Sequence, residues 1–146
     1  MTFLLDTNVA SEPTAKTPNA GVLAWLAARS SEELFLSAAT VAEIRYGIEA
    51  CPEGARKRAL SLWFDEAVIA NPDNVLPIGL DVAEAWGRLR RKAEAEKRSM
   101  PVMDAFIAAT AEIHGLTLVT RNVRDFEVWG GPVFNPWSDE PAPRSA

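Results

Sequence analysis

The sequence predicts a three-layer α/β/α fold in which helices cover both faces of a short, mostly parallel sheet. Short apolar runs alternate along the chain with longer segments of helical periodicity. The runs are continuously apolar, as in strands that are buried on both faces. Polar or turn-forming residues end most of the runs, and a chain that alternates strands with helices in this way usually builds a parallel sheet.

Two strands and three helices are predicted in the first half of the chain. Residues 3–5 form an apolar run that Asp6 ends, and residues 34–36 form a second run that Ser37 ends. Such short runs are typical of buried strands. Helices are expected at about 22–26, 40–50 and 54–70, where apolar residues recur with helical spacing.

The second half predicts three strands and two helices. Pro77 places the strand at 75–78 on an edge of the sheet, and further strands are expected at 116–119 and 133–134. A capping box at 81–84, with Asp81 in the cap position, opens a helix that runs to about Arg98. The last helix is expected from Pro101 to His114, with Gly115 as its C-terminal stop.

One domain over residues 1–137 is expected, followed by an acidic, proline-rich tail at 138–146 that is predicted to be disordered. The chain has 146 residues and a net charge of −5, so attraction of a polyanion requires a local basic patch or bound cations. It has no apolar run long enough for a membrane span and no signal peptide. Cys51 is the only cysteine, which favours a reducing, cytoplasmic setting.

Candidate catalytic residues follow the strands or lie in the first turns of the next helices. In parallel α/β sheets, ligands bind outside the carboxyl ends of the strands. Clustered carboxylates with no cysteine or histidine among them favour a hard cation, Mg²⁺ or Mn²⁺. His114 is the only histidine, which excludes two-histidine and triad mechanisms. The candidate residues are Asp6, Glu43, Asp104, Asn122 and Asp125.

Each acidic residue also has a structural interpretation. Asp6 is suited to cap a turn, and Glu43 forms a capping box with Thr40. Asp104 is favourable at the positive end of a helix, although alanines one and two turns later let that helix approach the sheet closely. The functional interpretation gains weight because the fold brings all three to one edge. We therefore expect Asp6, Glu43 and Asp104 to bind a divalent cation and cut a phosphodiester.

Four sequence blocks, in order and at the same spacing, closely resemble PIN-domain ribonucleases, especially VapC-type toxins of bacterial type II toxin–antitoxin modules. The resemblance extends from residue 2 to residue 137. It implies a three-layer fold, a Mg²⁺- or Mn²⁺-dependent endoribonuclease activity on RNA, a homodimer and a cognate antitoxin. The blocks are Leu4–Asn8, Val41–Gly47, Met103–Ala111 and Thr120–Phe126.

Carried over by position, the resemblance assigns Asp6, Glu43 and Asp104 to the three acidic residues of the family. The fourth acidic position is Asn122 here, so either Asn122 supplies a neutral oxygen or Asp125 substitutes for it. Thr7, Asn8 and Thr120 match supporting polar positions.

Basic residues provide two candidate contacts to phosphate. Arg121 and Arg124 lie next to the predicted site. The basic segment 88–98 is interpreted either as a solvated helix face or as a flank of the substrate path.

Two other functions are considered. An aspartyl-phosphate phosphatase would use Asp6 as a nucleophile, but such enzymes carry a second Asp where this chain has Asn8. A non-catalytic binding module would use the acidic edge to dock a basic partner segment.

Overall fold

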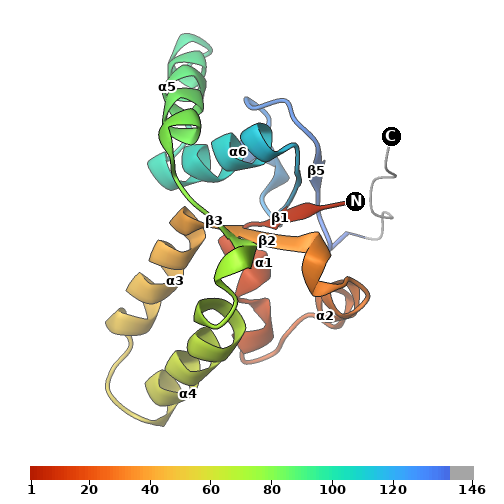
Figure 1. Cartoon of the computed structure of the whole chain (residues 1–146), viewed down its shortest axis with the longest axis vertical. Helices are drawn as coiled ribbons and strands as arrows, with labels where there is room; N and C mark the ends of the chain where they lie inside the picture. The colour runs from red at the N-terminus through yellow and green to blue at the C-terminus, as the bar shows by residue number, and fades with distance from the viewer. Residues whose placement is uncertain (139–146) are drawn as a thin grey trace.

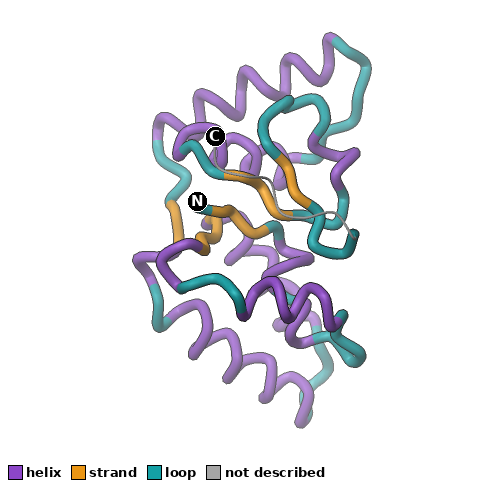
Figure 2. The backbone as a smooth tube through the Cα atoms, turned by 90° about the vertical axis from the view of Figure 1, so that its right-hand side faces the viewer, coloured by secondary structure: helices purple, strands orange, loops and turns teal. Residues whose placement is uncertain are grey.

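The computed structural model describes residues 1–138, and its centre is one sheet of five strands in the order β3-β2-β1-β4-β5. All four neighbouring pairs are parallel. Figure 2 shows the strands between two groups of helices. The strands are β1 (Phe3–Leu5), β2 (Leu34–Ser37), β3 (Val75–Leu76), β4 (Thr117–Val119) and β5 (Val133–Phe134).

The longer helices account for most of the remaining chain, and the predicted three-layer α/β/α class is confirmed (Figure 1). Short 3-10 turns, η1 (Glu12–Thr14) and η5 (Val123–Phe126) among them, join several elements. The helices are α1 (Thr7–Ala10), α2 (Ala20–Ala27), α3 (Ala38–Ala50), α4 (Ala55–Phe64), α5 (Leu80–Ala95) and α6 (Val102–His114). The predicted helix at 54–70 is α4 followed directly by a π-helical turn, η3 (Asp65–Ile69).

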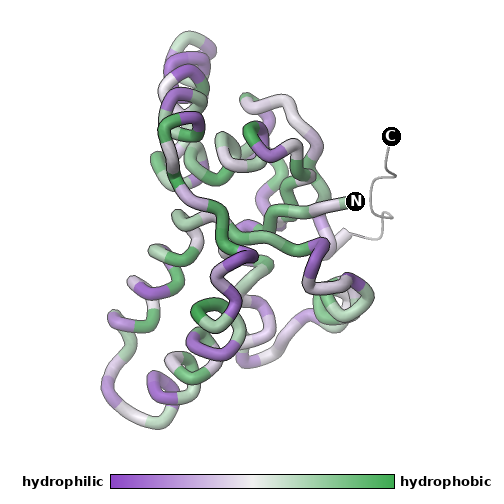
Figure 3. The backbone as a smooth tube through the Cα atoms, in the orientation of Figure 1, coloured by the Kyte–Doolittle hydropathy of each residue, from purple (hydrophilic) through white to green (hydrophobic). Residues whose placement is uncertain are grey.

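Residues of β1 divide the hydrophobic core between the two faces of the sheet. Leu4 packs in a cluster with Leu89 of α5 and Ala108 of α6. Its neighbours Phe3 and Leu5 belong to a second cluster, which includes residues of α1 and α2. Successive side chains of a strand point to opposite faces, so a three-residue strand anchors both helical layers. The centre of the molecule is accordingly hydrophobic (Figure 3).

Helix α3 begins two residues earlier than predicted, because Ser37 and not Thr40 is its N-cap. The Ser37 hydroxyl accepts a hydrogen bond from the Ala39 N–H at 3.0 Å. The capping-box interpretation of Glu43 is therefore wrong, and its carboxylate is free for other contacts. The apolar stripe of α3, Ile44 and Ile48, packs against α4 and η3.

Both ends of α5 differ from the prediction. Its N-cap is Gly79, and Asp81 lies in the first turn and accepts a hydrogen bond from the adjacent Val82 N–H at 2.7 Å. The helix ends at Ala95 and not near Arg98, since Lys97 adopts a left-handed conformation with φ of 54°. A reversal of this kind closes a helix end by hydrogen bonding its last carbonyls.

Helix α6 packs closely on α5 and on the sheet through small side chains. Ala105, Ala108 and Ala109 are fully buried, which lets the helix axis approach its neighbours and fixes the position of the first turn. Pro101 caps this helix instead of opening its first turn, and Gly115 ends it with a φ of 64°, as predicted.

Within residues 1–138, no helix is long and apolar enough to cross a membrane. Of the predicted disordered tail, residues 139–146 lie outside the described part of the chain.

Candidate active site

The strand order places the candidate site at the point where the sheet changes direction. From β1 the chain proceeds outward to β2 and β3, and then returns to add β4 and β5 on the other side of β1. The carboxyl ends of β1 and β4 therefore lie at the topological switch point, the usual ligand position in such sheets. Asp6 follows β1 and Thr120 follows β4, and the Asp6 N–H donates to the Val119 carbonyl at 2.9 Å.

Asp6 is the most buried of the acidic residues, with 6% of its surface exposed. Its Oδ1 accepts the Thr7 N–H at 2.7 Å, and its Oδ2 accepts the Thr120 hydroxyl at 2.7 Å. The first of these bonds makes Asp6 the N-cap of α1, a short helix that the sequence did not predict. Asp6 therefore caps α1 and also lies in the candidate site.

A network of polar side chains joins the ends of β1 and β4. The Asn8 amide donates to Asp6 Oδ2 and to Thr120 Oγ1, both at 3.3 Å. Asn8 Oδ1 in turn accepts the Arg121 N–H at 3.3 Å, and Thr120 Oγ1 accepts the Asn122 N–H at 3.0 Å. These contacts fix the Asp6 carboxylate against two strand ends.

Glu43 joins this network from α3. Its Oε1 accepts the Thr7 hydroxyl at 2.8 Å, so Thr7 holds both acidic side chains, Asp6 through its backbone N–H and Glu43 through its hydroxyl. Thr40 is fully buried beneath them, with its hydroxyl 3.4 Å from that of Thr7. Thr40 was predicted only as a possible cap, because its hydrogen-bond partner Thr7 is 33 residues away in the chain.

Burial and neighbouring negative charges raise the pKa values of Asp6 and Asp104. Burial, and to a smaller extent the charges of Asp6, Asp125 and Glu43, together raise the pKa of Asp104 to about 6. Burial also raises the pKa of Asp6, which Glu43 and Asp125 increase while the hydrogen bonds from Thr120 and Thr7 lower it. The charges of Glu43 and Asp125 thus lie close enough to raise the pKa of both Asp6 and Asp104.

The two candidates for the fourth acidic position differ in charge. Asn122 and Asp125 are both exposed, at the start of η5 and within it. Asp125 raises the pKa of both Asp6 and Asp104. Asn122 contributes its backbone N–H to Thr120.

The donor set has the chemistry that a hard divalent cation requires. It consists of carboxylate oxygens whose charges oppose one another, and a bound cation relieves such repulsion. In the described residues, no three His, Cys, Asp or Glu side chains are already grouped so as to hold one metal ion. Asp6 and Glu43 instead each accept a threonine hydroxyl. The carboxylates therefore have the chemistry that binds a divalent cation, but within the described residues they are not already arranged around one common position.

Arg121 borders the site and stacks on an aromatic ring. Its guanidinium lies 5.3 Å from the centre of the Trp137 ring, and its carbonyl accepts the Asn135 amide at 3.5 Å. Arg124 lies three residues after Arg121, within η5, and is exposed. Nothing local in the sequence indicates that Asn135 and Trp137 contact Arg121, so neither was predicted as a site residue.

The basic segment 88–98 is largely engaged in structural contacts. Arg90 donates to the Met100 carbonyl at 2.6 Å, and Lys92 donates to the Val128 carbonyl at 2.6 Å. Arg98 pairs with Glu127 at 2.7 Å, and Arg91 pairs with Glu94. These contacts favour the interpretation of a helix face over that of a substrate flank.

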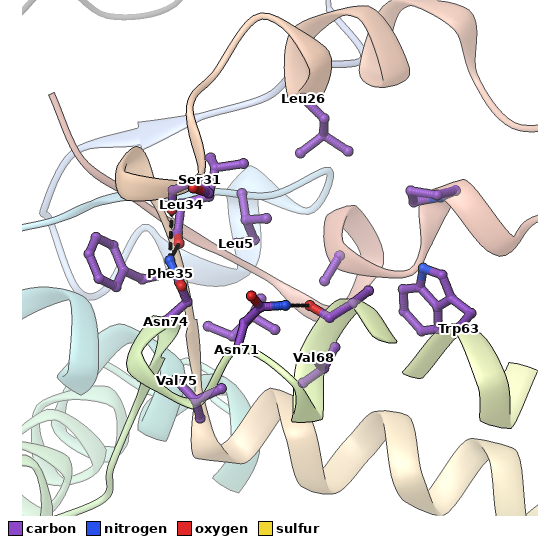
Figure 4. Close-up of a pocket in the computed structure, with 14 residues that line it drawn as sticks. Leu5, Leu26, Ser31, Leu34, Phe35, Trp63, Val68, Asn71, Asn74 and Val75 are labelled. Carbon is purple, nitrogen blue, oxygen red and sulfur yellow. Dashed lines mark hydrogen bonds between the residues drawn. The ribbon is translucent and has the colours of Figure 1, made fainter. Parts of the chain in front are cut away.

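A pocket on the other side of α1 contains no titratable side chain. It has a volume of about 280 Å³ and is lined mainly by apolar residues of β1, β2, α2 and the α4–η3 segment (Figure 4). Its two polar amides are occupied: Asn74 donates to the Leu34 carbonyl at 2.9 Å, and Asn71 donates to the Ala67 carbonyl at 3.3 Å. This pocket offers no acid or base, and Ser31 supplies a hydroxyl with no base beside it.

The fold and the site define an α/β domain with a carboxylate-based site at its topological switch point. Comparison with known proteins identifies it: residues 3–129 match the family model described as PIN domain. The chain belongs to the PIN-domain family, which confirms the family predicted from four sequence blocks.

Close relatives cover nearly the whole chain. It is 40% identical to a VapC ribonuclease of Sinorhizobium fredii over 96% of this chain and 99% of the relative. It is 38% identical to the toxin FitB of Neisseria gonorrhoeae over 94% of this chain and 99% of the relative. It is 36% identical to a chain in a solved structure of FitAB bound to a DNA fragment, with a TM-score of 0.89. The match covers 95% of this chain and 98% of that chain.

Proposed function

We propose that the protein is a divalent-cation-dependent endoribonuclease that acts as the toxin of a toxin–antitoxin module, with Mg²⁺ or Mn²⁺ as its cofactor. The observation that carries the proposal is the acidic group at the switch point of a PIN fold, where burial and the charges of Glu43 and Asp125 raise the pKa of both Asp6 and Asp104. The names of the relatives, a VapC ribonuclease and a FitB toxin, support RNA cleavage and the toxin role.

In this proposal Asp6, Glu43 and Asp104 bind the cation and Asp125 fills the fourth acidic position. Asp125 is favoured over Asn122 because its charge reaches both Asp6 and Asp104. A bound cation supplies Lewis-acid polarisation of the phosphate and neutralises charge on the departing oxygen. Thr120 and Thr7 hold the Asp6 and Glu43 carboxylates in position, and Asn8 links the two strand ends. Arg121 and Arg124 supply positive charge for the RNA phosphates.

We also propose a cognate antitoxin and a homodimer as partners of the protein in the cytoplasm. The antitoxin is supported by the similarity to the toxin FitB and to the solved FitAB structure, and the homodimer is carried over from the family resemblance. The acidic edge would suit a basic segment of that antitoxin, so docking and catalysis are compatible uses of the same residues.

The test is cleavage of single-stranded RNA by the purified protein with MgCl₂ or MnCl₂, and again with EDTA. Asp104→Ala is expected to lower the cleavage rate at least about 100-fold, because a carboxylate that binds the cation is lost. Glu112→Ala, on the exposed far end of the same helix, is the matched control and should retain activity. Undiminished cleavage by Asp104→Ala, with its fold intact by circular dichroism, would refute the assignment. Antitoxin binding without any cleavage would favour the docking module.

A further inference from the structure

A groove leads from the acidic site along α3, and apart from Thr7 and Glu43 the proposed mechanism uses none of its lining residues. It has a volume of about 260 Å³ and lies between α1, α3 and α4. Thr7 and Glu43, which are hydrogen bonded to each other, line its inner end. Arg56 of α4 lines it as well. In Figure 1, α3 and α4 run side by side below the sheet. The groove is therefore continuous with the candidate active site.

Gly47 lines this groove one helical turn after Glu43. A glycine inside a helix costs about 0.5–1 kcal/mol relative to alanine. Its backbone conformation does not require glycine, since its φ is not positive, and a Cβ added there would meet no atom within 4 Å. Neither the fold of α3 nor its packing within the chain explains the residue. An open helix surface beside Glu43 leaves room for a ligand that approaches the backbone closely.

The sides of the groove combine an aromatic wall with a positive charge. Leu60 and Trp63 of α4 supply apolar surface, together with the stripe of α3. The exposed Arg56 guanidinium donates one hydrogen bond, to the Thr14 carbonyl at 2.6 Å. In the described part of the chain no carboxylate lies within salt-bridge distance of it. Its charge and its remaining N–H groups are available to an anion.

This combination suits one nucleotide of a single-stranded RNA. Proteins recognise unpaired bases by stacking them on aromatic or arginine side chains, and guanidinium groups bind phosphate oxygens. We infer that the groove between α1, α3 and α4 binds the nucleotide adjacent to the cleaved bond, with Arg56 on its phosphate and the base against Trp63. The inference rests on the proposed ribonuclease function and assigns its substrate a defined subsite.

Filling the groove at Gly47 tests the inference. The Cβ of Gly47→Leu meets no atom within 4 Å, and the substitution improves helix propensity, so the thermal midpoint should not fall. Gly87→Leu is the matched control. Gly87 is likewise exposed, open and inside a helix, but it lies on α5 across the sheet from the groove. Arg56→Gln is a second variant that removes only the charge.

Binding of a fluorescein-labelled, random-sequence RNA 12-mer is measured by fluorescence anisotropy in EDTA, so that the readout is independent of cleavage. Gly47→Leu and Arg56→Gln are expected to raise Kd at least about fivefold, and KM for cleavage in MnCl₂ should rise with it. Gly87→Leu should match the wild type. Equal Kd values for Gly47→Leu and the wild type overturn the subsite, whatever the cleavage activity. A wild type that binds RNA through this groove but never cleaves it overturns the proposed function alone. A wild type that binds no RNA overturns both.

Discussion

Asp104 differs from Asp6 in how its charge is compensated. Asp6 accepts hydrogen bonds from Thr7 and Thr120, whereas no hydrogen bond to the Asp104 carboxylate occurs within the described residues, and its pKa is raised from 3.8 to about 6. A carboxylate with a raised pKa destabilises the folded state once it is ionised. The ionised Asp104 side chain thus lowers the stability of the cation-free folded state.

The stability of the cation-free protein should therefore depend on pH through Asp104. Between about pH 4 and pH 6 the folded chain retains a proton that the unfolded chain has lost, so stability falls as pH rises through this window. Asp104→Asn removes the penalty. In EDTA at pH 7.5 the variant is expected to melt roughly 2–5 °C above the wild type, and at pH 4 the difference should vanish.

Differential scanning calorimetry at the two pH values measures this difference. Asp73→Asn, at an exposed aspartate outside the site, is the control and should show no such pH-dependent gain. An Asp104→Asn variant that melts at or below the wild type at pH 7.5 would contradict the argument.

Among the elements, α5 shows that a basic segment does not by itself indicate a nucleic-acid surface. Arg90 and Lys92 donate to backbone carbonyls outside the helix, and Arg98 pairs with Glu127. The helix is thereby attached to the loop before α6 and to the segment before β5. Its positive charges stabilise the fold in preference to binding phosphate.

Lys92→Met is expected to lower the free energy of unfolding by about 1–2 kcal/mol, because the variant loses a charge-assisted hydrogen bond to the Val128 carbonyl. RNA affinity should remain unchanged. Urea denaturation and anisotropy measure the two quantities, and Arg88→Met, at an exposed position of the same helix, serves as the control. Loss of RNA affinity without loss of stability would instead support the interpretation of a substrate flank.

For the whole molecule, a net charge of −5 means that RNA binding depends on a few local cations. Arg121 is the best placed of these, since it borders Asn8 and stacks on Trp137. Arg121→Gln is expected to weaken RNA binding and to reduce the slope of log K against log salt by roughly 0.7, the value for one phosphate contact on a single strand. Titrations at several KCl concentrations give the slope, and Arg88→Gln should leave it unchanged. An unaltered slope for Arg121→Gln would exclude a phosphate contact.

The sequence predicted much of this architecture because its local signals agree with the tertiary structure. The apolar runs at 3–5 and 116–119, the stop at Gly115 and the edge strand before Pro77 were all recognisable, because each is signalled by a pattern within a few residues. The helix limits at Gly79 and Lys97 were not. The backbone conformations at Gly79 and Lys97 depend on how α5 packs on its neighbours. The capping-box pattern at 81–84 also predicted an N-cap two residues too late.

For the site, the sequence by itself determined which residues carry acidic chemistry and, through four blocks in register, the PIN family. Only the tertiary structure decided how they are held. The bond from Thr120 to Asp6 joins residues 114 positions apart, and the bond from Thr7 to Glu43 spans 36. Periodicity and capping patterns report contacts within a few residues. Such distant partners, the effect of the Asp125 charge on Asp6 and Asp104, and the groove beside Gly47 arise only when the fold brings separate segments together.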